Sequence, residues 1–512
     1  MAIMGSGPML NAYPDSLGGR LENAVRFLSI PELKDCFQSF YILPSLFNSD
    51  LDRGFSVIDY GLNESVAQRD DLNYLKLMGI DLKLDFVLNH LSVQSPQFQD
   101  ILSYGHASRY IDFFINWNRF WDGYGWMTDG GYIQPDPEML TNMFFRKPGL
   151  PFLMVHLPDG EEVPFWNTFY QKILYTGESV SGYLGQMDLD IKSPLVWEFY
   201  EETLRILADY GASIVRLDAF AYAPKAPGKR NFLNSPETWD LLQKIRQIAD
   251  RYNLNILPEI HSRYCEEIHT LITEKGYTTY DFYLPGLILD ALDCKDPSIL
   301  IRWIHEIRTK GMRTVNMLGC HDGIPLLDLE GLLPIERIDT LVQMLVERGG
   351  YVKELHGQKD IYYQVNTTYY SALGESDDLL LLARALQLFI PGKPQVWYLD
   401  LFAGKNDLEA VDKAGPGGHK EINRTNLDWE MIQEGLGRPV VRKQLEMLRF
   451  RNMFPAFGFD ADLEIFNDQF GTLGLQWTLN GYRARLDADL VAGSFSVEAF
   501  DQEGRPVFSM MN

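Results

Sequence analysis

Short apolar runs that end in a carboxylate recur along this chain, and they constrain its fold more than any other feature. Three of them are Ser213–Asp218, Leu254–Glu259 and Thr314–Asp322. Longer amphipathic stretches, such as 195–210 and 238–252, lie between runs of this kind. Strand–helix alternation is typical of parallel βα units, in which active sites are built at the carboxyl ends of the strands.

The spacing of the acids indicates that they share one sheet. Asp218 and Glu259 lie 41 residues apart, which fits one βα unit, and Glu259 and Asp322 lie 63 apart, which fits two. Further candidate strands are 39–44, 81–88, 280–283 and 395–398. We therefore predict an α/β fold with a (β/α)8 TIM barrel.

Two stretches are too long for one βα unit and predict inserted domains. Asp85 and Asp218 are 133 residues apart, and the stretch between them is rich in Trp, Tyr, Gly and Pro, which suggests loops over a cleft. After about residue 455, the runs 475–479 and 495–500 predict antiparallel strands. The predicted division is a barrel from 1–90, 191–322 and 376–455, inserted domain B at 91–190, inserted domain B′ at 323–375, and a C-terminal β domain at 456–512.

Charge and cysteine content exclude several classes of partner. The chain has 46 basic and 70 acidic residues, a net charge of −24, which disfavours nucleic acid and anionic membranes. Its four cysteines are scattered without a CxxC pair, so we expect neither a disulfide framework nor a zinc site. With no signal-like amino terminus and no long apolar stretch, we expect a cytoplasmic location. A homodimer is one assembly that the sequence leaves open.

The three acids suit the cleavage of a glycosidic bond with retention, which needs two carboxyl groups at the anomeric carbon. We predict Asp218 as the nucleophile, kept ionised by Arg216, which lies two residues earlier on the same side of the strand. We predict Glu259 as the acid/base, because its apolar neighbours raise its pKa. Asp322, next to His321, is the predicted transition-state stabiliser. A single strand-end acid is as readily a helix cap; three at βα spacing favour a site.

His90 adds a fourth element directly after the strand 81–88. Its ring can donate a hydrogen bond to a sugar hydroxyl. On its own, however, it is equally well an ordinary histidine at the end of a strand.

Four segments resemble the signature regions of glycoside hydrolase family 13, the α-amylase family. They are Asp85-Phe-Val-Leu-Asn-His90, Val215-Arg-Leu-Asp-Ala219, Pro258-Glu-Ile-His261 and Leu318-Gly-Cys-His-Asp322. Other segments resemble its sucrose phosphorylase branch, among them Tyr13-Pro-Asp-Ser-Leu-Gly18, Arg53-Gly-Phe-Ser-Val-Ile-Asp59, Pro148-Gly-Leu-Pro-Phe152, Tyr363-Gln-Val-Asn-Thr-Thr-Tyr-Tyr-Ser-Ala-Leu373 and Ile422-Asn-Arg424. The similarity runs from about residue 11 to 455.

The resemblance implies a double displacement through a β-glucosyl-enzyme on Asp218, which phosphate resolves to α-glucose 1-phosphate. It implies a glucose subsite lined by Asp52, His90, Arg216, His321 and Arg424, with Phe55 and Phe169 as an aromatic clamp. It places Tyr222, Gln186, His261, Tyr363 and Gln364 at the subsite shared by the leaving group and phosphate. It implies no metal and no organic cofactor, and a small sugar and phosphate as the partners.

Phosphate has to be bound by side chains, because no segment resembles a P-loop and Gly5-Ser-Gly7 lacks the rest of a dinucleotide fingerprint. Arg146 and Lys147, just before Pro148, form the best basic pair, and His261 and Arg424 join them. The alternative is that this pair belongs to a solvated loop.

The chain departs from the family pattern near the predicted acceptor site. Gly319 and Cys320 stand where the branch carries Asp and Thr, and Lys147 stands where it carries Arg, with Arg146 one place earlier. Residues Tyr170 to Gly185 form an insertion that we expect to overhang the acceptor. The glucose chemistry is unaffected by these changes, whereas the acceptor is put in question.

Fructose, fructose 6-phosphate, glycerol and glycerate are the candidate acceptors. The segments Tyr13 to Gly18 and Asp328 to Leu332 resemble the sucrose 6′-phosphate branch, whereas Tyr363 is typical of the sucrose branch. We favour sucrose as the substrate, with sucrose 6′-phosphate, glucosylglycerol or glucosylglycerate as alternatives. A hydrolase or transglucosidase, and a sugar-binding subunit without activity, are the alternatives from other classes.

Overall fold

An eight-stranded sheet forms the centre of the protein. The structure is a computed structural model that describes residues 4–177, 179–354, 362–415 and 418–512. The strand order is β14-β13-β5-β2-β1-β20-β16-β15, so neighbours follow chain order and the first strand lies beside the last. The β1–β20 pairing is parallel, with Met9 opposite Gln395. This nearly closed ring of parallel strands, open between β14 and β15, confirms the predicted (β/α)8 barrel.

Seven of the eight barrel strands match predicted runs to within two residues at each end, except that β16 covers only the first four residues of the run Thr314–Asp322. The strands are β1 (Met9–Ala12), β2 (Ser39–Ile42), β5 (Asp81–Val87), β13 (Ala212–Asp218), β14 (Asn255–Pro258), β15 (Thr279–Asp281), β16 (Thr314–Met317) and β20 (Lys393–Trp397). Only β1 is absent from the predictions, because its four residues form no longer apolar run. Its place between β2 and β20 stabilises it in the sheet.

Helices follow the strands as the βα pattern requires. They are α1 (Leu21–Ser29), α2 (Arg69–Leu77), α6 (Pro194–Asp209), α7 (Glu237–Arg251), α8 (Ile268–Glu274), α9 (Leu284–Cys294), α10 (Ser298–Thr309), α13 (Asp377–Phe389), α16 (Trp429–Gly437) and α17 (Pro439–Met453). In α6, Pro194 begins the helix, and Val196, Tyr200, Leu204 and Leu207 are buried at helical spacing. The predicted helices 195–210 and 238–252 are therefore confirmed as α6 and α7.

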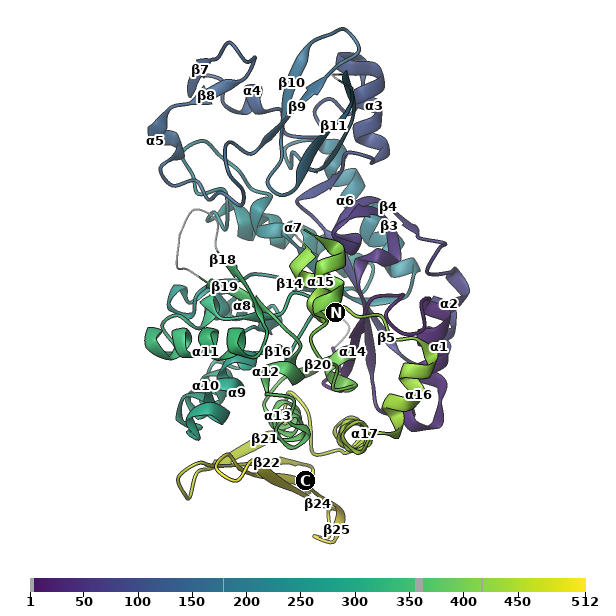
Figure 1. Ribbon diagram of the computed structural model, residues 1–512, viewed down its shortest axis with the longest axis vertical. Helices are drawn as coiled ribbons and strands as arrows, with labels where there is room; N and C mark the ends of the chain where they lie inside the picture. The colour runs from purple at the N-terminus through teal and green to yellow at the C-terminus, as the bar shows by residue number, and fades with distance from the viewer. Residues whose placement is uncertain (1–3, 178, 355–361, 416–417) are drawn as a thin grey trace. The chain divides into compact units, whose positions relative to one another are not determined.

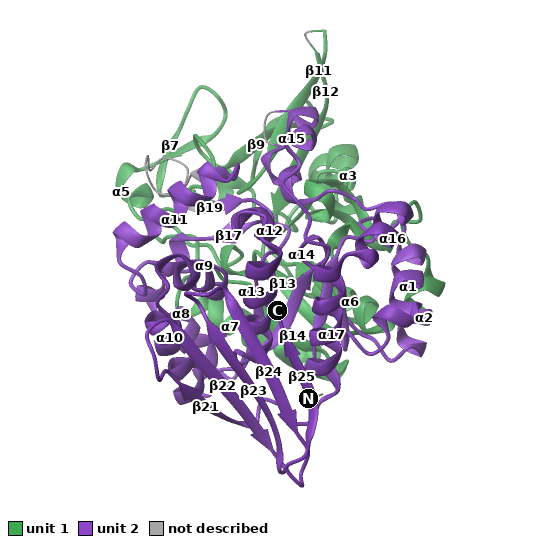
Figure 2. Cartoon of the chain, turned by 60° about the horizontal axis from the view of Figure 1, so that its bottom comes forward, with its two compact units in different colours: residues 1–2, 42–73, 83–260 green, residues 3–41, 74–82, 261–512 purple. Residues whose placement is uncertain are grey.

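The chain forms two compact units, coloured separately in Figure 2. Unit 1 comprises residues 1–2, 42–73 and 83–260, and unit 2 comprises residues 3–41, 74–82 and 261–512. Strands β13 and β14 belong to unit 1, which also contains most of β5. The other five barrel strands belong to unit 2, except for Ile42 at the end of β2. The domain boundaries given above stay a prediction.

In unit 1, the stretch between β5 and α6 has a small core of its own. Its elements are β6 (His90–Ser92), α3 (Pro96–Tyr104), α4 (Trp117–Phe120), β7 (Gly125–Met127), β8 (Ile133–Pro135), α5 (Pro137–Leu140), β9 (Phe152–His156), β10 (Glu162–Trp166), β11 (Gln171–Thr176) and β12 (Ser179–Asp188). Trp117, Trp121 and Trp166 are almost fully buried against one another, whereas Trp126 is 53% exposed. Most of the tryptophans predicted to lie in loops over a cleft are therefore core residues.

Unit 1 also contains the hairpin that the chain forms before α2. Its strands are β3 (Phe47–Leu51) and β4 (Ser56–Leu62), and they pair antiparallel. The short turn Asp52–Gly54 joins them. This turn carries Asp52 and leads directly into Phe55, and both are predicted residues of the glucose site, as described below.

In unit 2, two further antiparallel sheets follow the barrel strands. The stretch after β16 contains β17 (Ile324–Pro325), α11 (Ile335–Glu347), β18 (Tyr351–Glu354), β19 (Tyr362–Asn366) and α12 (Tyr369–Ala372). After β20 come α14 (Tyr398–Leu401) and α15 (Leu408–Ala414), and the chain ends in β21 (Asp462–Phe466), β22 (Thr472–Leu479), β23 (Tyr482–Asp489), β24 (Ser494–Phe500) and β25 (Pro506–Met511). The last five strands form a meander, yellow in Figure 1, which confirms the predicted C-terminal β structure.

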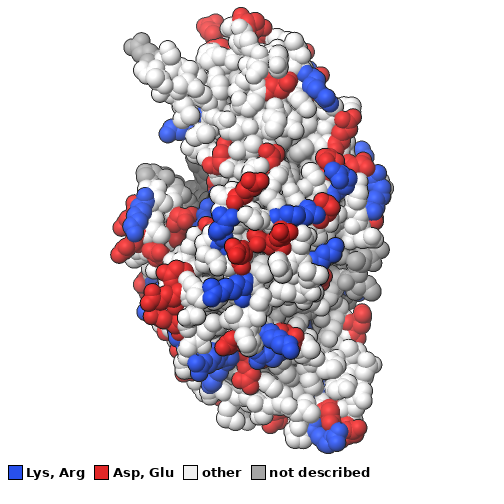
Figure 3. Space-filling model, turned by 90° about the vertical axis from the view of Figure 1, so that its right-hand side faces the viewer, with Lys and Arg blue, Asp and Glu red and all other residues white. Residues whose placement is uncertain are grey.

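The surface carries both signs of charge. On the face drawn in Figure 3, acidic and basic side chains are interspersed, without a broad basic patch. Within the described ranges, every helix is too short or too polar to cross a membrane.

Candidate active site

Arg216 is the centre of the part of the site that unit 1 contributes. Because β13 is extended, Arg216 and Asp218 point to the same side, and Arg216 Nη1 lies 2.9 Å from Asp218 Oδ1. The same nitrogen lies 2.5 Å from Asp85 Oδ1 on β5, and Arg216 Nη2 lies 2.6 Å from Glu259 Oε1. Only 4% of the Arg216 side chain is exposed, so these ion pairs are strong. The structure thus brings Asp218 and Glu259 onto one guanidinium.

Glu259 reaches this position because the β13–β14 pairing continues past the strand. Its backbone N–H donates to Leu217 O over 3.3 Å. Its carboxylate pairs with the buried guanidinium of Arg216, a contact that the apolar neighbours in the sequence do not indicate. For Glu259 to act as an acid, this ion pair has to weaken once substrate is bound.

A strained turn presents Phe55 to His90 and Gln186. Asp52 and Arg53 have φ of 48° and 47°, a left-handed conformation that is uncommon outside glycine. Phe55 O lies 3.0 Å from His90 Nε2 and accepts from Gln186 Nε2 over 3.1 Å. Burial lowers the pKa of His90, so its ring is neutral at pH 7. These contacts place Phe55, His90 and Gln186 together, while Asp52 is exposed at the start of the turn.

Gln186 is more restrained than the subsite role predicts. Its Oε1 accepts from Tyr170 N over 3.1 Å, and its side chain is buried. Both ends of the amide therefore bind protein groups. Gln186 ties the insertion that begins at Tyr170 to Phe55 and His90, so its contact with a ligand stays a prediction.

Aromatic rings and a guanidinium surround Phe169. The ring centroid of Phe169 lies 5.1 Å from that of His90 and 5.2 Å from that of Tyr222. Arg146 Cζ lies 5.8 Å from the Phe169 centroid and 6.0 Å from the Tyr222 centroid. Arg146 is thus a cation beside the predicted aromatic clamp, rather than part of a solvated loop.

Lys147 has a different environment from Arg146. Its Nζ donates to Asn167 Oδ1, and Asn167 in turn donates to the carbonyls of Tyr170 and Gln186, 2.9 Å each. Burial lowers the pKa of Lys147 to about 7. Lys147 therefore supports the loop that carries Phe169, and Arg146 is the better candidate for an anion.

Asp322 is surrounded by cations in unit 2. Its Oδ2 lies 3.2 Å from His321 Nε2, and its Oδ1 lies 2.7 Å from Lys420 Nζ and 3.6 Å from Arg424 Nη2. Burial would raise the pKa of Asp322, but His321, Lys420 and Arg424 together hold it well below the usual value. Arg424 Nε also donates to His321 O over 2.9 Å. Asp322 is consequently a stable anion, as a stabiliser of positive charge should be.

The other predicted residues of unit 2 fall into two groups. Gln364 Nε2 donates to Asp322 O over 2.8 Å, whereas the side chain of Tyr363 lies outside the described part of the structure. His261 Nδ1 lies 2.8 Å from Asp328 Oδ2, and the His261 ring stacks on Phe282 with centroids 3.9 Å apart. Asp328 and Phe282 thus fix the orientation of the His261 ring.

Several residues of these clusters were not among the predicted site residues. Asp85 lies within a quoted motif, and Lys420 lies four residues before Arg424, so both had a local signal. Asp188 and Lys225, which form a buried ion pair in unit 1, had none, because they interact with each other and with groups distant in the chain. Asp218 and Glu259 lie in unit 1 and Asp322 in unit 2, and one site formed by all three stays a prediction.

Comparisons with known proteins identify the family. The alpha amylase catalytic domain matches residues 36–291. A sucrose 6(F)-phosphate phosphorylase of Ilumatobacter coccineus is 54% identical over 96% of this chain and 95% of its own. A sucrose phosphorylase of Streptococcus mutans is 35% identical over 89% of each chain.

A solved structure agrees over the whole chain. The crystal structure of sucrose 6F-phosphate phosphorylase from Thermoanaerobacter thermosaccharolyticum superposes with a TM-score of 0.89 and 33% identity, covering 100% of this chain and 98% of that one. The barrel, the inserted stretches and the C-terminal sheet are therefore shared with it. The chain belongs to the α-amylase family, in its sucrose phosphorylase branch, and is a phosphorylase of the glycosyltransferase type.

Proposed function

We propose that this protein is a sucrose 6F-phosphate phosphorylase, which transfers glucose from sucrose 6F-phosphate to phosphate and releases fructose 6-phosphate. The observation that carries the proposal is the 54% identity, over 96% of the chain, to the Ilumatobacter relative of that name. The sequence alone favoured sucrose because of Tyr363. The identity to a sucrose phosphorylase is lower, at 35%, so the comparisons support sucrose 6F-phosphate as the substrate better than sucrose.

In the first step, Asp218 attacks carbon 1 of the glucosyl group as the bond to the fructosyl oxygen breaks. Glu259 gives its proton to that oxygen, so fructose 6-phosphate leaves with its hydroxyl restored. The contact of Arg216 with both carboxylates supports these roles, because it aligns them and keeps Asp218 ionised. A β-glucosyl ester on Asp218 remains.

In the second step, an oxygen of phosphate attacks carbon 1 and the ester bond to Asp218 breaks. Glu259, now a carboxylate, takes the proton of the attacking phosphate and returns to its starting state. The product is α-glucose 1-phosphate, and two inversions give net retention. We assign Asp322 the stabilisation of the positive charge on the ring, supported by its low pKa.

A phosphorylated acceptor needs more cations than a neutral one. His261 is held by Asp328, which belongs to the segment shared with the sucrose 6′-phosphate branch, and a protonated His261 would suit a phosphate group. Arg146 beside Phe169 in unit 1 and Lys420 in unit 2 are further candidates. These contacts support fructose 6-phosphate over the neutral acceptors fructose and glycerol.

The test compares matched substrates. With α-glucose 1-phosphate as donor, we expect kcat/KM for fructose 6-phosphate to exceed that for fructose by about 100-fold or more, since two charge-assisted contacts supply roughly 3 kcal/mol. A higher kcat/KM for fructose would instead identify sucrose as the substrate. Glucose release at the same rate with and without phosphate would instead indicate the hydrolase.

One variant isolates the acceptor phosphate. His261→Gln should lower kcat/KM for fructose 6-phosphate by about tenfold or more, and leave that for fructose within about threefold. His305→Gln changes an exposed histidine of the same unit and serves as the control. Equal losses for both acceptors would remove His261 from phosphate recognition.

We also assign the enzyme to the cytoplasm, because its proposed substrate and product are sugar phosphates, which do not cross membranes unaided. Detection of the protein in a membrane or secreted fraction would contradict this. Sedimentation would decide whether it is the homodimer that the sequence leaves open.

A further inference from the structure

A buried ammonium group joins three segments of unit 1. Only 2% of the Lys225 side chain is exposed, and its Nζ lies 2.8 Å from Asp188 Oδ2. The same nitrogen donates to Asn89 Oδ1 over 3.0 Å and to Tyr222 O over 2.5 Å. Lys225 therefore places all three of its N–H groups on oxygens from different parts of the chain.

Asp188 extends the network to a fourth segment. It accepts from Thr168 N over 2.8 Å, from Thr168 Oγ1 over 2.6 Å and from Asn89 Nδ2 over 3.0 Å. It is also opposite His90 in the β12–β6 pairing. Both carboxylate oxygens are thus satisfied, and the pair is fully hydrogen-bonded, as a buried ion pair has to be.

The network binds residues at or next to three predicted residues of the glucose site. Asn89 precedes His90, Thr168 precedes Phe169, and Tyr222 is itself a predicted subsite residue whose carbonyl is bound. The ring of Phe169 lies between the other two, with its centroid 5.1 Å from that of His90 and 5.2 Å from that of Tyr222. The position of these rings therefore depends on one cation.

The electrostatics agree with an ion pair. Burial lowers the pKa of Lys225, and the Asp188 carboxylate opposes that effect. Burial would raise the pKa of Asp188, but Lys225 and Thr168 outweigh it and lower that pKa. Lys225 Nζ also lies 5.6 Å from the Trp166 ring centroid, which favours the ammonium form.

We propose that Lys225 and Asp188 are positioning residues that fix His90, Phe169 and Tyr222 for the glucosyl group. The proposal rests on the proposed function only for the nature of that group. Neither residue touches the reacting atoms. Their effect is on the placement of the residues that do, where small displacements are costly.

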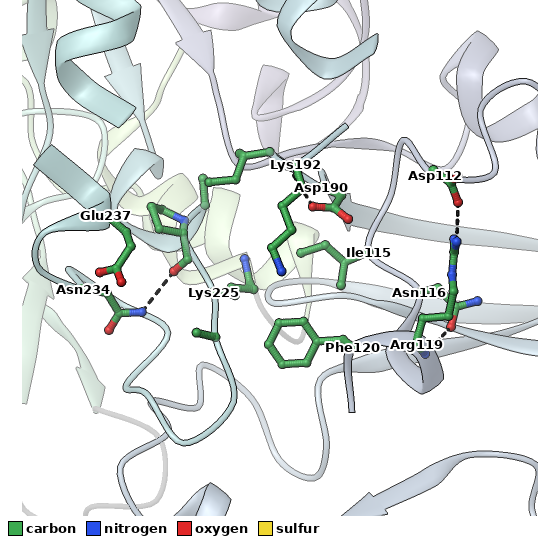
Figure 4. Close-up of a pocket in the computed structure, with 14 residues that line it drawn as sticks. Asp112, Ile115, Asn116, Arg119, Phe120, Asp190, Lys192, Lys225, Asn234 and Glu237 are labelled. Carbon is green, nitrogen blue, oxygen red and sulfur yellow. Dashed lines mark hydrogen bonds and ion pairs between the residues drawn. The ribbon is translucent and has the colours of Figure 1, made fainter. Parts of the chain in front are cut away.

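A pocket of about 290 Å³ gives access to this network from outside. Its lining includes Lys225 and, from an exposed position, Lys192, both labelled in Figure 4. Shortening Lys225 to alanine would leave a space next to this pocket. A small ammonium ion can then reach Asp188.

The first experiment shortens each lysine of the pocket in turn. Lys225→Ala should raise KM for α-glucose 1-phosphate and lower kcat/KM by roughly 100-fold, assayed well below its unfolding temperature. Lys192→Ala, in the lining of the same pocket, should leave both constants within about twofold. A purely structural role would lower kcat with the folded fraction and leave KM unchanged, which would overturn the proposal.

Chemical rescue separates charge from volume. Propylammonium, which replaces the atoms lost in Lys225→Ala, should restore kcat/KM at least tenfold in a saturable manner. Propanol, of similar size but neutral, should restore less than twofold. Equal rescue by both, or by neither, would contradict a positioning cation.

A double variant guards against simple misfolding. Lys225→Met with Asp188→Asn leaves no unpaired buried charge, so its unfolding temperature should return close to that of the wild type. Its KM for the glucosyl donor should stay at least tenfold raised, and recovery of KM together with stability would overturn the proposal. Wild type and variants are assayed with the same donor and acceptor. If the proposed acceptor is wrong, the wild type itself shows low activity, whereas failure of the positioning role appears only as an unchanged KM in the variants.

Discussion

Arg216 contacts three carboxylates, so the chemistry of each depends on one guanidinium. The Asp85 side chain is fully buried, so its contact with Arg216 is fixed. The side chains of Asp218 and Glu259, in contrast, are 13% and 14% exposed. Substrate can therefore change the two exposed contacts without disturbing the buried one. This division suits a site in which one acid stays ionised and the other has to gain a proton.

Loss of the Asp218 carboxylate should abolish the reaction. We expect Asp218→Asn to lower kcat by about 10⁴-fold or more, since no other group can form the glucosyl ester. Phosphate release from α-glucose 1-phosphate and fructose 6-phosphate measures the loss. Asp209→Asn, an exposed aspartate of the same unit, is the control, and retained activity in Asp218→Asn would exclude the assigned nucleophile.

Gly54 is required by both its backbone and its surroundings. Its φ is +116°, and an added Cβ would lie 2.1 Å from Ser45 N. Gly123, with φ of +79° and open space around it, provides the comparison. Gly54→Ala should destabilise the protein by several kcal/mol and Gly123→Ala by about 1–2 kcal/mol, read from thermal unfolding. Equal shifts would show that the turn before Phe55 relaxes freely.

Lys147 makes stability depend on pH in a predictable direction. Its pKa is lowered from 10.5 to about 7, so between these values the unfolded chain binds a proton that the folded chain does not. Folding stability therefore rises with pH above about 7, with a slope of up to about 1.4 kcal/mol per pH unit from this group. Unfolding of wild type and Lys147→Met from pH 7 to 9 should show a smaller rise in the variant. Lys172→Met, at an exposed lysine, should keep the wild-type slope.

Among the elements, the β11–β12 hairpin separates a fixed base from an exposed tip. The base is held by Asn167, Gln186 and the bond from Val93 N to Gly185 O, 2.9 Å. The tip exposes 61% of Tyr175. The insertion is thus anchored beside the predicted glucose residues, while its far end is available for other contacts.

Shortening the tip tests the predicted role at the acceptor. Ile173 and Tyr183 are directly opposite, so Asn-Gly can replace residues 174–182 as a two-residue turn that keeps the buried Tyr183. We expect KM for fructose 6-phosphate to rise about tenfold, equivalent to 1.4 kcal/mol, with little change in unfolding temperature. The slow hydrolysis of α-glucose 1-phosphate by water is the control and should not change. An unaltered KM would separate the insertion from the acceptor.

The sequence predicted those features that depend on neighbouring residues in the chain, and missed those that depend on contacts between distant ones. Strands β13, β14 and β16 were predictable because each is an apolar run with its acid attached. The four-residue β1 was not, since pairing with distant strands stabilises it. Asp218 and Arg216 could be paired from their spacing alone. The bond from Arg216 to Glu259, and the one from Lys225 to Asp188, join residues whose proximity only the fold determines.

For the whole molecule, the C-terminal sheet covers a helix that cannot be exposed. Residues Leu380 to Phe389 of α13 are all buried, β23 and β24 pack against α13, and Trp477 Nε1 donates to Phe389 O over 2.7 Å. Deleting residues 459–512 should uncover this helix and cause aggregation, seen by size-exclusion chromatography. Trp477→Phe keeps the sheet and should cost only about 1 kcal/mol. A monomeric deletion variant with wild-type unfolding temperature would show that the sheet is dispensable.

The pairing of β1 with β20 has a consequence during protein synthesis. Met9 to Asn11 pair with residues 395–397. Strand β1 therefore cannot pair with β20 until most of the chain has been translated. At 5–20 residues per second, that wait is roughly 20–80 s. One edge of β1 is open throughout, and open edges recruit other strands. Ribosome-bound chains shorter than about 400 residues should therefore bind chaperones strongly, and release from them should coincide with the emergence of β20.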